Sequence, residues 1–391
     1  MSAYGPEQLK AYLELISLPG KYLPAQAQQN GLQAQQSQEA PFPLPAEYLN
    51  LELLTALHVG HISSIPYENL SLHYSASHRV ELDPLFLYEK IVTGSGGDAG
   101  HRRGSAGDVG SEGPGGTNGA KSQGRGGYCM ENALFFWNML MAIGFEARLA
   151  GVRIRERIVG VPKGGYVGWV HVVNIVTLPN GAEYMLDVSF GGDGPTLPLP
   201  LTANLVHYNS VGTQEIRLIH SEDPFTNPEA PPSSSTPAGE DQAEDKKHRF
   251  WIYQYRNDPL TTAPDGGWNS FYAFSDAYAF RAADLKVMNW YTSTHPESFQ
   301  TFTALVVKFL RRRRALSGKT DDVEDEGEFE IYGKRMLVDN VIKENTGGKT
   351  RVVQVCQTEK ERVEALEKWF GIYLTEEQRR GIAGTRTEIV G

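Results

Sequence analysis

The hydrophobic pattern of this chain changes period at Gly144, and this change constrains the fold more than any other feature. Before Gly144, apolar residues recur at helical spacing in two segments, 46–64 and 131–143. From Glu146 onward, apolar residues alternate with polar ones or run together, with many β-branched side chains, which is typical of strands. The pattern predicts an α+β protein in which helices precede an antiparallel sheet.

Beyond Gly144, the Pro-Asn-Gly triplet at 179–181 predicts the turn of a hairpin. Later segments also carry patterns of their own, without an internal repeat. The predicted elements are strands at 145–160, 168–178, 183–191, 301–310 and 351–358, and a closing helix at 359–372.

Three segments have too few apolar residues to offset the entropy of ordering them. One is rich in Gln and Pro, one in Gly, Ser and Asp, and one in Pro, Ser and acidic residues. We expect them to be surface insertions between structured elements. They are 26–45, 93–124 and 222–247.

The bulk composition narrows the class of protein. The 391-residue chain has a net charge of −10, which argues against a nucleic-acid partner held through phosphate contacts. Its two cysteines exclude a disulfide framework and suggest a reducing compartment. Neither a signal peptide nor an apolar stretch of membrane-spanning length is evident. A cytoplasmic protein without a membrane partner is the expectation.

Cys129 follows two glycines and precedes the predicted helix at 131–143. A cysteine in the first turn of a helix faces free backbone N–H groups, which favour the thiolate and lower the thiol pKa. Arg125 adds positive charge nearby. The alternative is that Cys129 is a small buried side chain with no chemical role.

A nucleophilic thiolate needs a base, and the base needs an orienting carboxylate. His171 lies within one predicted strand, and Asp187 lies between apolar residues in the next. An unpaired buried carboxylate is costly, so a histidine one strand away is the simplest partner to predict. The alternatives are a hydrogen-bonded core histidine and an Asp in a turn or cap.

The register of this hairpin tests the pairing. A two-residue turn at Asn180-Gly181 would place His171 and Asp187 on opposite faces of the sheet. A three-residue or five-residue loop, or a bulge, would place them on the same face. The pairing therefore requires that the hairpin is not the simple two-residue type.

Three further motifs are predicted to be structural. His58 and His61 have the i, i+3 spacing that can bind a metal, but no third ligand is evident and their helix has an apolar stripe. The run of arginines at 311–314 is predicted to be an exposed charged loop, with a contact to coenzyme A phosphates as the alternative. Cys356 is predicted to be an ordinary strand residue.

Together these segments resemble the arylamine N-acetyltransferases. The order and spacing of RGGYCMEN, GWVHVVNIV and MLDVSFGG, which contain Cys129, His171 and Asp187, are similar to that family's Cys-His-Asp signature. IPYENL is similar to another family motif, with Tyr67 where Phe is usual. The resemblance covers most of the chain outside the insertions and points to a fungal-type member. Further similar segments are 268–276, 289–302 and 364–377.

The resemblance implies three domains around a papain-like Cys-His-Asp core. It implies an N-terminal helical domain that carries the cysteine, a central antiparallel β-barrel that carries His and Asp, and a C-terminal α/β lid that follows an interdomain helix. The implied ranges are 1–148 with an insertion at 96–120, 149–282 with an insertion at 222–247, and 283–391.

The resemblance also implies an activity. Cys129 would accept an acyl group from an acyl-coenzyme A, and an aromatic amine or hydrazine would then take it, in a ping-pong scheme in which His171 moves the protons. Acyl-coenzyme A is a co-substrate here, and no permanently bound cofactor or metal is implied. The donor chain (acetyl, propionyl or malonyl), the physiological amine and the oligomeric state stay open.

Other site residues are likewise implied by resemblance. Tyr67 would line the wall of the amine site. Arg125 and Glu131 would form a buried ion pair beside the nucleophile, the alternative being a solvated pair at the helix start. Gly164 and Gly165, in a predicted loop before the His171 strand, are candidates for contact with coenzyme A. Two other functions stay open, a cysteine hydrolase (thioesterase or peptidase) with the same core and a binding protein without activity.

Overall fold

The structure of this protein, a computed structural model, describes most of the chain. The described residues are 2–24, 42–94, 123–221, 224–225, 249–263, 266–314 and 328–390. The predicted insertion at 96–120 and nearly all of the one at 222–247 lie outside them, as does most of the Gln-rich segment at 26–45.

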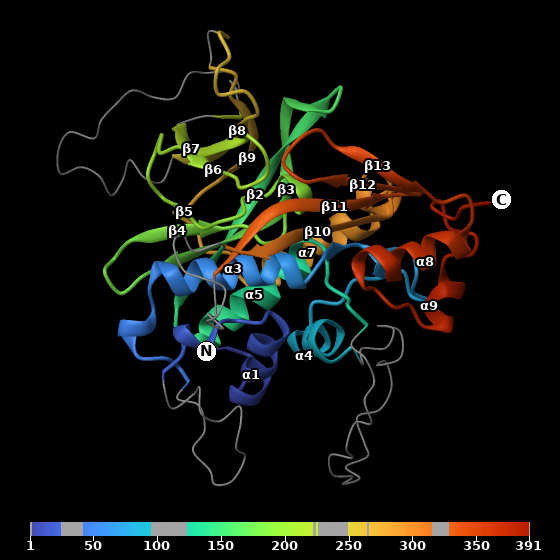
Figure 1. The fold of residues 1–391 in the computed structure, drawn as a ribbon, viewed down its shortest axis with the longest axis horizontal. Coiled ribbons are helices and arrows are strands. Elements are labelled where there is room, and N and C mark those ends of the chain that lie inside the picture. Colours follow the sequence, from blue (N-terminus) through green and yellow to red (C-terminus); the bar gives the residue numbers. More distant parts are fainter. Residues whose placement is uncertain are drawn as a thin grey trace, which may run out of the picture.

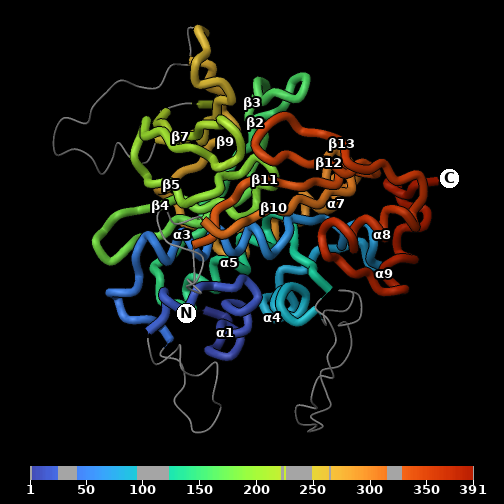
Figure 2. Tube along the Cα trace, viewed as in Figure 1, coloured from blue at the N-terminus to red at the C-terminus, as the bar shows by residue number. Residues whose placement is uncertain are grey.

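Apart from α7, which packs against β3, the described α-helices form two groups (Figure 1). The first, with α1, α3, α4 and α5, lies below the sheets in the view, and α8 and α9 lie at the right near the C-terminus; Figure 2 shows the same separation along the trace. The helices are α1 (Pro6–Leu15), α3 (Leu51–Ser64), α4 (Pro84–Tyr88), α5 (Cys129–Ile143), α7 (Ala282–Thr294), α8 (Glu359–Phe370) and α9 (Glu376–Gly381). Short helical turns are η1 (Gly20–Tyr22), η2 (Ala46–Tyr48), η3 (Leu70–Leu72), the π-helical η4 (Glu89–Thr93), η6 (Gly191–Asp193) and η8 (Phe299–Thr301).

Capping residues explain the ends of the two long helices. The side chain of Asn50 accepts a hydrogen bond from the Leu53 N–H at 3.0 Å, so α3 starts at Leu51 rather than at the predicted residue 46. Gly144 has φ +119° and ends α5, which confirms its predicted role as a C-terminal glycine.

The strands form two sheets in which all neighbours are antiparallel. The smaller sheet has the order β1-β10-β11-β12-β13 and the larger has the order β5-β4-β3-β2-β9-β8-β7-β6. The strands are β1 (Tyr67–Glu68), β2 (Glu146–Ile158), β3 (Val161–Thr177), β4 (Glu183–Leu186), β5 (Leu199–Pro200), β6 (His207–Tyr208), β7 (Glu215–Ser221), β8 (Phe250–Arg256), β9 (Asn269–Phe274), β10 (Leu305–Arg313), β11 (Phe329–Val338), β12 (Val341–Asn345) and β13 (Arg351–Val355).

The larger sheet confirms the predicted antiparallel middle region. It curls, as β2 and β3 turn away from β4 in Figure 1, but within the described residues no ladder joins its end strands β5 and β6. In these residues the implied barrel is therefore a curled sheet with two edges. The smaller sheet crosses the predicted domain limits, because β1 comes from the N-terminal segment.

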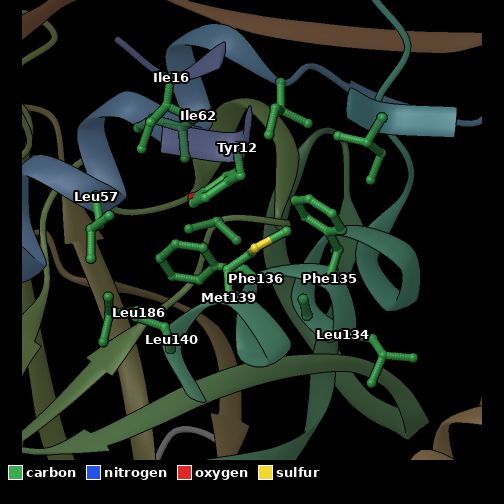
Figure 3. Packing of buried hydrophobic residues seen from close by; sticks show 14 of the residues in the cluster. Tyr12, Ile16, Leu57, Ile62, Leu134, Phe135, Phe136, Met139, Leu140 and Leu186 are labelled. Atoms are coloured by element: carbon green, nitrogen blue, oxygen red, sulfur yellow. The ribbon is translucent and has the colours of Figure 1, made fainter. Parts of the chain in front are cut away.

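Helix α5 is the centre of the largest hydrophobic core. Leu134, Phe135, Phe136, Met139 and Leu140 of this helix are almost completely buried. They pack among side chains from α1, α3 and β4, as Figure 3 shows with Tyr12, Leu57, Ile62 and Leu186. The first turn of α5 is thereby held rigidly against the rest of the protein.

The same core draws residues from all three predicted domains, such as Leu57, Val172 and Phe309. The division at 148 and 282 stays a prediction. The arginine run at 311–314 is not a loop as predicted, because β10 continues to Arg313 and pairs with β11. Within the described ranges, no helix combines the length and the apolar character that a membrane span requires.

Candidate active site

Cys129 is the first residue of α5, which starts two residues before the predicted helix at 131–143; its predicted place at or near the first turn is confirmed. Gly127 lies against β1, since its N–H donates to the Pro66 carbonyl and its carbonyl accepts from the Glu68 N–H at 2.9 Å. A side chain at Gly126 would come within 1.8 Å of the Pro66 oxygen, so the close approach needs a glycine there. The two glycines thus bring the chain tightly along β1 into the helix that begins with Cys129.

His171 and Asp187 are paired. The turn between β3 and β4 has three residues, Pro179 to Gly181, because the Leu178 N–H donates to the Ala182 carbonyl and Asn174 lies opposite Leu186. This register puts His171 and Asp187 on one face, and His171 Nε2 lies 2.8 Å from Asp187 Oδ2. Both side chains are almost fully buried.

The Cys129 thiol lies beside the His171 strand. Its Sγ is 3.7 Å from the carbonyl oxygen of Val170, the residue before His171, and 3.0 Å from Met130 Sδ. With Nε2 engaged by Asp187, the ring nitrogen left for the thiol is Nδ1. The structure therefore brings all three predicted residues to one place from α5, β3 and the end of β4.

The thiol pKa differs from the prediction. Burial raises the pKa of the Cys129 thiol, and the negative charges of Asp187 and Glu131 raise it further. The backbone N–H groups of Met130 and Cys129 lower it, as expected at a helix start, but less than burial raises it. The predicted low thiol pKa is wrong because Cys129 is only 5% exposed.

Tyr67 lies next to this site and is buried. It bridges to Gly127, and its hydroxyl accepts a hydrogen bond from Gln300 Nε2 at 2.5 Å. Burial and the neighbouring Cys129 raise the pKa of Tyr67, so its hydroxyl keeps its proton. The role of Tyr67 in lining the amine site stays a prediction.

Four buried charged side chains lie near Cys129, and we call them the buried quartet (Glu68, Lys90, Arg125, Glu131). Arg125 Nε donates to Glu68 Oε1 at 3.0 Å, so Arg125 pairs with Glu68 rather than with Glu131 as predicted. Lys90 Nζ donates to Glu131 Oε1 at 2.7 Å and lies 3.3 Å from Glu68 Oε1. The four side chains are 0–5% exposed and carry equal numbers of positive and negative charges.

Glu131 links the quartet to the N-terminal end of α5, where Cys129 lies. Its Oε2 accepts a hydrogen bond from the Tyr128 N–H at 3.1 Å, which caps the helix just before Cys129. The two cations hold the pKa of Glu68 down at about 2, whereas burial and Glu68 raise the pKa of Glu131. Lys90 thus connects the cap of α5 to β1 through two carboxylates.

Gly164 and Gly165 are not in a loop as predicted. They lie in β3, within a long hairpin that turns at Val159 and Gly160, both with positive φ. The Gly164 carbonyl accepts from Arg155 Nε at 2.9 Å. The glycine-rich segment is an arm of the β2–β3 hairpin, and its contact with coenzyme A stays a prediction.

His58, His61 and Cys356, which were predicted to be structural, are buried in the structure. His58 Nε2 lies 3.0 Å from the Pro195 carbonyl oxygen and His61 Nδ1 lies 3.2 Å from the Tyr12 hydroxyl, and burial lowers their pKa values to about 4 and 3. Cys356 is buried just after β13. Among the described residues, no group of three or more His, Cys, Asp or Glu is arranged to hold a metal ion.

Comparison with known proteins shows the family of this chain. A family model described as N-acetyltransferase matches residues 50–98 and 121–379, which is most of the chain. The chain belongs to this N-acetyltransferase family. The resemblance seen in the sequence motifs is thereby confirmed.

The relatives of this chain include an N-malonyltransferase and an arylamine N-acetyltransferase. The chain is 31% identical over 389 residues to the N-malonyltransferase FDB2 of Fusarium pseudograminearum, covering 98% of this chain and 93% of that protein. It is 24% identical over 265 residues to an arylamine N-acetyltransferase of Mycobacterium tuberculosis, covering 68% of this chain and 73% of that protein.

Solved structures show the same fold. The arylamine N-acetyltransferase of Nocardia farcinica matches with a TM-score of 0.61 at 21% identity, covering 98% of each chain. The Mycobacterium marinum arylamine N-acetyltransferase in complex with CoA matches with a TM-score of 0.58 at 20% identity, covering 96% of this chain and 99% of that one.

Several residues around Cys129, His171 and Asp187 were not predicted from the sequence. The Ser189 N–H donates to Asp187 Oδ1 at 3.1 Å. The rings of Phe190 and Tyr272 lie 5.1 and 5.8 Å from the His171 ring. Ser189 and Phe190 directly follow Asp187, so the hairpin could have indicated them, whereas Tyr272 and Lys90 come from distant segments without a local signal.

Proposed function

We propose that this protein is an acyl-coenzyme A-dependent N-acyltransferase that works by a ping-pong mechanism through a thioester on Cys129. The observation that carries the proposal is the buried His171–Asp187 pair at 2.8 Å, with the Cys129 thiol beside the same strand. A nucleophile, a base and an orienting carboxylate are the groups that acyl transfer requires.

In the first half-reaction, Cys129 Sγ attacks the thioester carbonyl of the donor while His171 Nδ1 takes the thiol proton. The raised thiol pKa means that the resting enzyme holds a protonated thiol, so deprotonation is coupled to attack. The bond to the coenzyme A sulfur breaks, and His171 returns the proton to that sulfur as it leaves. The N–H groups of Cys129 and Met130 are donors for the oxyanion.

In the second half-reaction, the amine nitrogen attacks the Cys129 thioester carbonyl. His171 takes a proton from the amine and returns it to Sγ when the carbon–sulfur bond breaks. The products are the N-acyl amine and the free thiol. Asp187 holds the imidazole in the required tautomer and stabilises the imidazolium that forms in both halves.

The substrates are proposed from the relatives. The names of the two relatives support malonyl-coenzyme A and acetyl-coenzyme A as donors and arylamines as acceptors. We propose that Tyr67, buried beside the thiol, lines the amine site. A role in the detoxification of aromatic amines, contact of Gly164 and Gly165 with coenzyme A, and a cytoplasmic location remain predictions.

The test follows free coenzyme A after mixing the protein with acetyl-, propionyl- or malonyl-coenzyme A, with and without a simple aniline. We expect one equivalent of release without amine and continued release with it. Continued release that ignores the amine would indicate a hydrolase instead. No release with any donor would leave only the binding-protein alternative.

Two variants locate the chemistry. Cys129→Ser is expected to abolish the acyl-enzyme seen by intact-protein mass spectrometry, with an unchanged circular dichroism spectrum. Cys356→Ser is the matched control, because it removes the other buried cysteine and is expected to leave turnover unchanged. Turnover retained in Cys129→Ser would show that the nucleophile is misassigned.

A further inference from the structure

A second charge cluster, the open trio (Arg157, Asp193, Lys334), lies on the sheet side of the triad. Arg157 Nη2 lies 2.5 Å from Asp193 Oδ2, and Lys334 Nζ lies 3.5 Å from Asp193 Oδ1. Lys334 also donates to the Gly192 carbonyl. The three residues come from β2, η6 and β11, so only the folded chain brings them together.

The trio carries a net positive charge and is open to solvent. One carboxylate is shared by two cations, and both cations lower the pKa of Asp193, so it stays ionised. The side chains of Arg157, Asp193 and Lys334 are 46%, 33% and 13% exposed. The mechanism proposed above uses none of them.

Two aromatic side chains, Phe271 and Phe190, connect the trio to His171. Arg157 lies over the Phe271 ring at 5.7 Å, Phe271 packs on Phe190 at 5.6 Å, and Phe190 packs on His171 at 5.1 Å. On its other side, η6 meets the amine wall, because a side chain at Gly191 would lie 3.9 Å from the Tyr67 ring. The loop that carries Asp193 begins directly after the triad residue Asp187.

We propose that the open trio attracts the carboxylate of an anionic acyl donor, a coenzyme A thioester of a dicarboxylic acid, and so sets the donor preference of the enzyme. This inference rests on the proposed function. The triad already contains one buried carboxylate, Asp187, and the quartet has no charge to spare. A second carboxylate on the acyl group therefore needs a positive charge from elsewhere, and the trio supplies it.

The experiment measures acylation of Cys129 in the full-length protein without an amine, so that only the donor half-reaction counts. The donors are malonyl-coenzyme A, whose acyl group carries a carboxylate, and acetyl- and propionyl-coenzyme A, whose acyl groups are uncharged. Lys334→Met is expected to lower the acylation rate constant for malonyl-coenzyme A about tenfold, because one charged interaction is lost. The rate constants for acetyl- and propionyl-coenzyme A are expected to change by less than about threefold. Lys360→Met, which removes the same charge from an 86% exposed position on α8, is expected to change none of these rate constants.

A second variant separates charge from structure. Asp193→Asn raises the net charge of the trio from +1 to +2, so the ratio of malonyl to acetyl rates is expected to rise, opposite to the effect of Lys334→Met. A purely structural role would lower both rates in both variants and would overturn the inference. Equal losses for all donors in Lys334→Met would mean that the bound anion is a phosphate of coenzyme A, which also overturns it.

The wild type separates this inference from the proposed function. Acylation by acetyl- and propionyl- but not malonyl-coenzyme A would overturn the inference alone. A wild-type protein that no donor acylates would overturn the proposed function and this inference with it.

Discussion

Two charge clusters flank the Cys129–His171–Asp187 group, and they differ in burial and in charge balance. The quartet on the helix side is 0–5% exposed and neutral. The trio on the sheet side is partly exposed and carries one excess positive charge. Both clusters place two cations on shared carboxylates, so the types of residue alone do not distinguish them.

Burial decides what each cluster can do. Charges in the protein interior are tolerated only when they are paired, and loss of one partner leaves a buried charge without compensation. Exposed pairs contribute little to stability because water screens them. We therefore assign the quartet to holding the first turn of α5 and leave the trio free to meet a charged ligand.

The largest expected effect is on stability. Lys90→Met leaves the two quartet carboxylates with one cation, and we expect it to lower the free energy of unfolding by about 3–5 kcal/mol. Lys334→Met should lower it by less than about 1 kcal/mol. Urea denaturation followed by circular dichroism measures both. The double variant Lys90→Met/Glu131→Gln, which restores neutrality, should recover part of the loss, and equal losses for Lys90→Met and Lys334→Met would remove the distinction.

The next effect is the pH dependence of stability. The pKa of Glu68 is lowered to about 2, so the stability it contributes is present above its usual value of 4.5 and is lost as pH falls towards 2. Over that range the loss is about 3 kcal/mol, from 1.36 kcal/mol per unit of pKa. The destabilisation caused by Glu68→Gln should therefore shrink as pH falls from 5 to 3. Asp193→Asn, which removes a more exposed carboxylate, is the control, and the destabilisation it causes is expected to depend less on pH.

The third effect concerns the thiol. Because its pKa is raised, alkylation of Cys129 by iodoacetamide should keep increasing with pH beyond 9, measured in a Cys356→Ser background. Glu131→Gln removes one of the negative charges that raise this pKa and should move the curve to lower pH, whereas Arg157→Gln should not lower it. A rate that levels off below pH 7 in the parent protein would mean that the resting thiol is already ionised.

The smallest expected effect is the response to salt. Raising ionic strength from 0.01 to 0.15 M shortens the Debye length from about 30 Å to about 8 Å. The ratio of malonyl to acetyl acylation rates should fall by a few-fold in the wild type and stay constant in Lys334→Met. The free energy of unfolding should change little, because the quartet is buried. A ratio that ignores salt in the wild type would argue against attraction by the trio.

Local patterns predicted much of the fold. The helical apolar run, Gly144 and the β-branched segments predicted α5 and the strands β2, β3 and β4, because propensity and periodicity act over a few residues. Strands β11 and β12 were missed. Their charged residues, such as Arg335 and Glu344, disguise the alternation, and these two are paired at 2.6 Å across the neighbouring strands. That pairing exists only in the folded sheet.

For the site, too, local patterns predicted part of the arrangement but not the contacts between distant residues. Motif order indicated the three candidate catalytic residues. Because side chains alternate between the two faces of a strand, their pairing predicted that the hairpin joining two of them could not have a two-residue turn. Charge partners were not predictable in this way. Arg125 was expected to pair with Glu131, six residues away, but it pairs with Glu68, and Lys90 takes Glu131. Nearness in sequence gives no distance between side chains that leave the backbone in different directions.

By itself, the sequence determined the change from helices to strands at Gly144, the family, and which cysteine, histidine and aspartate are the candidates for nucleophile, base and carboxylate. These follow from local periodicity and from motifs whose spacing is visible along the chain. Only the tertiary structure decided the thiol pKa, the partners of the buried charges and the position of Arg157 and Lys334 beside the triad. Those properties depend on desolvation and on distances between residues far apart in sequence, which arise only when the chain packs.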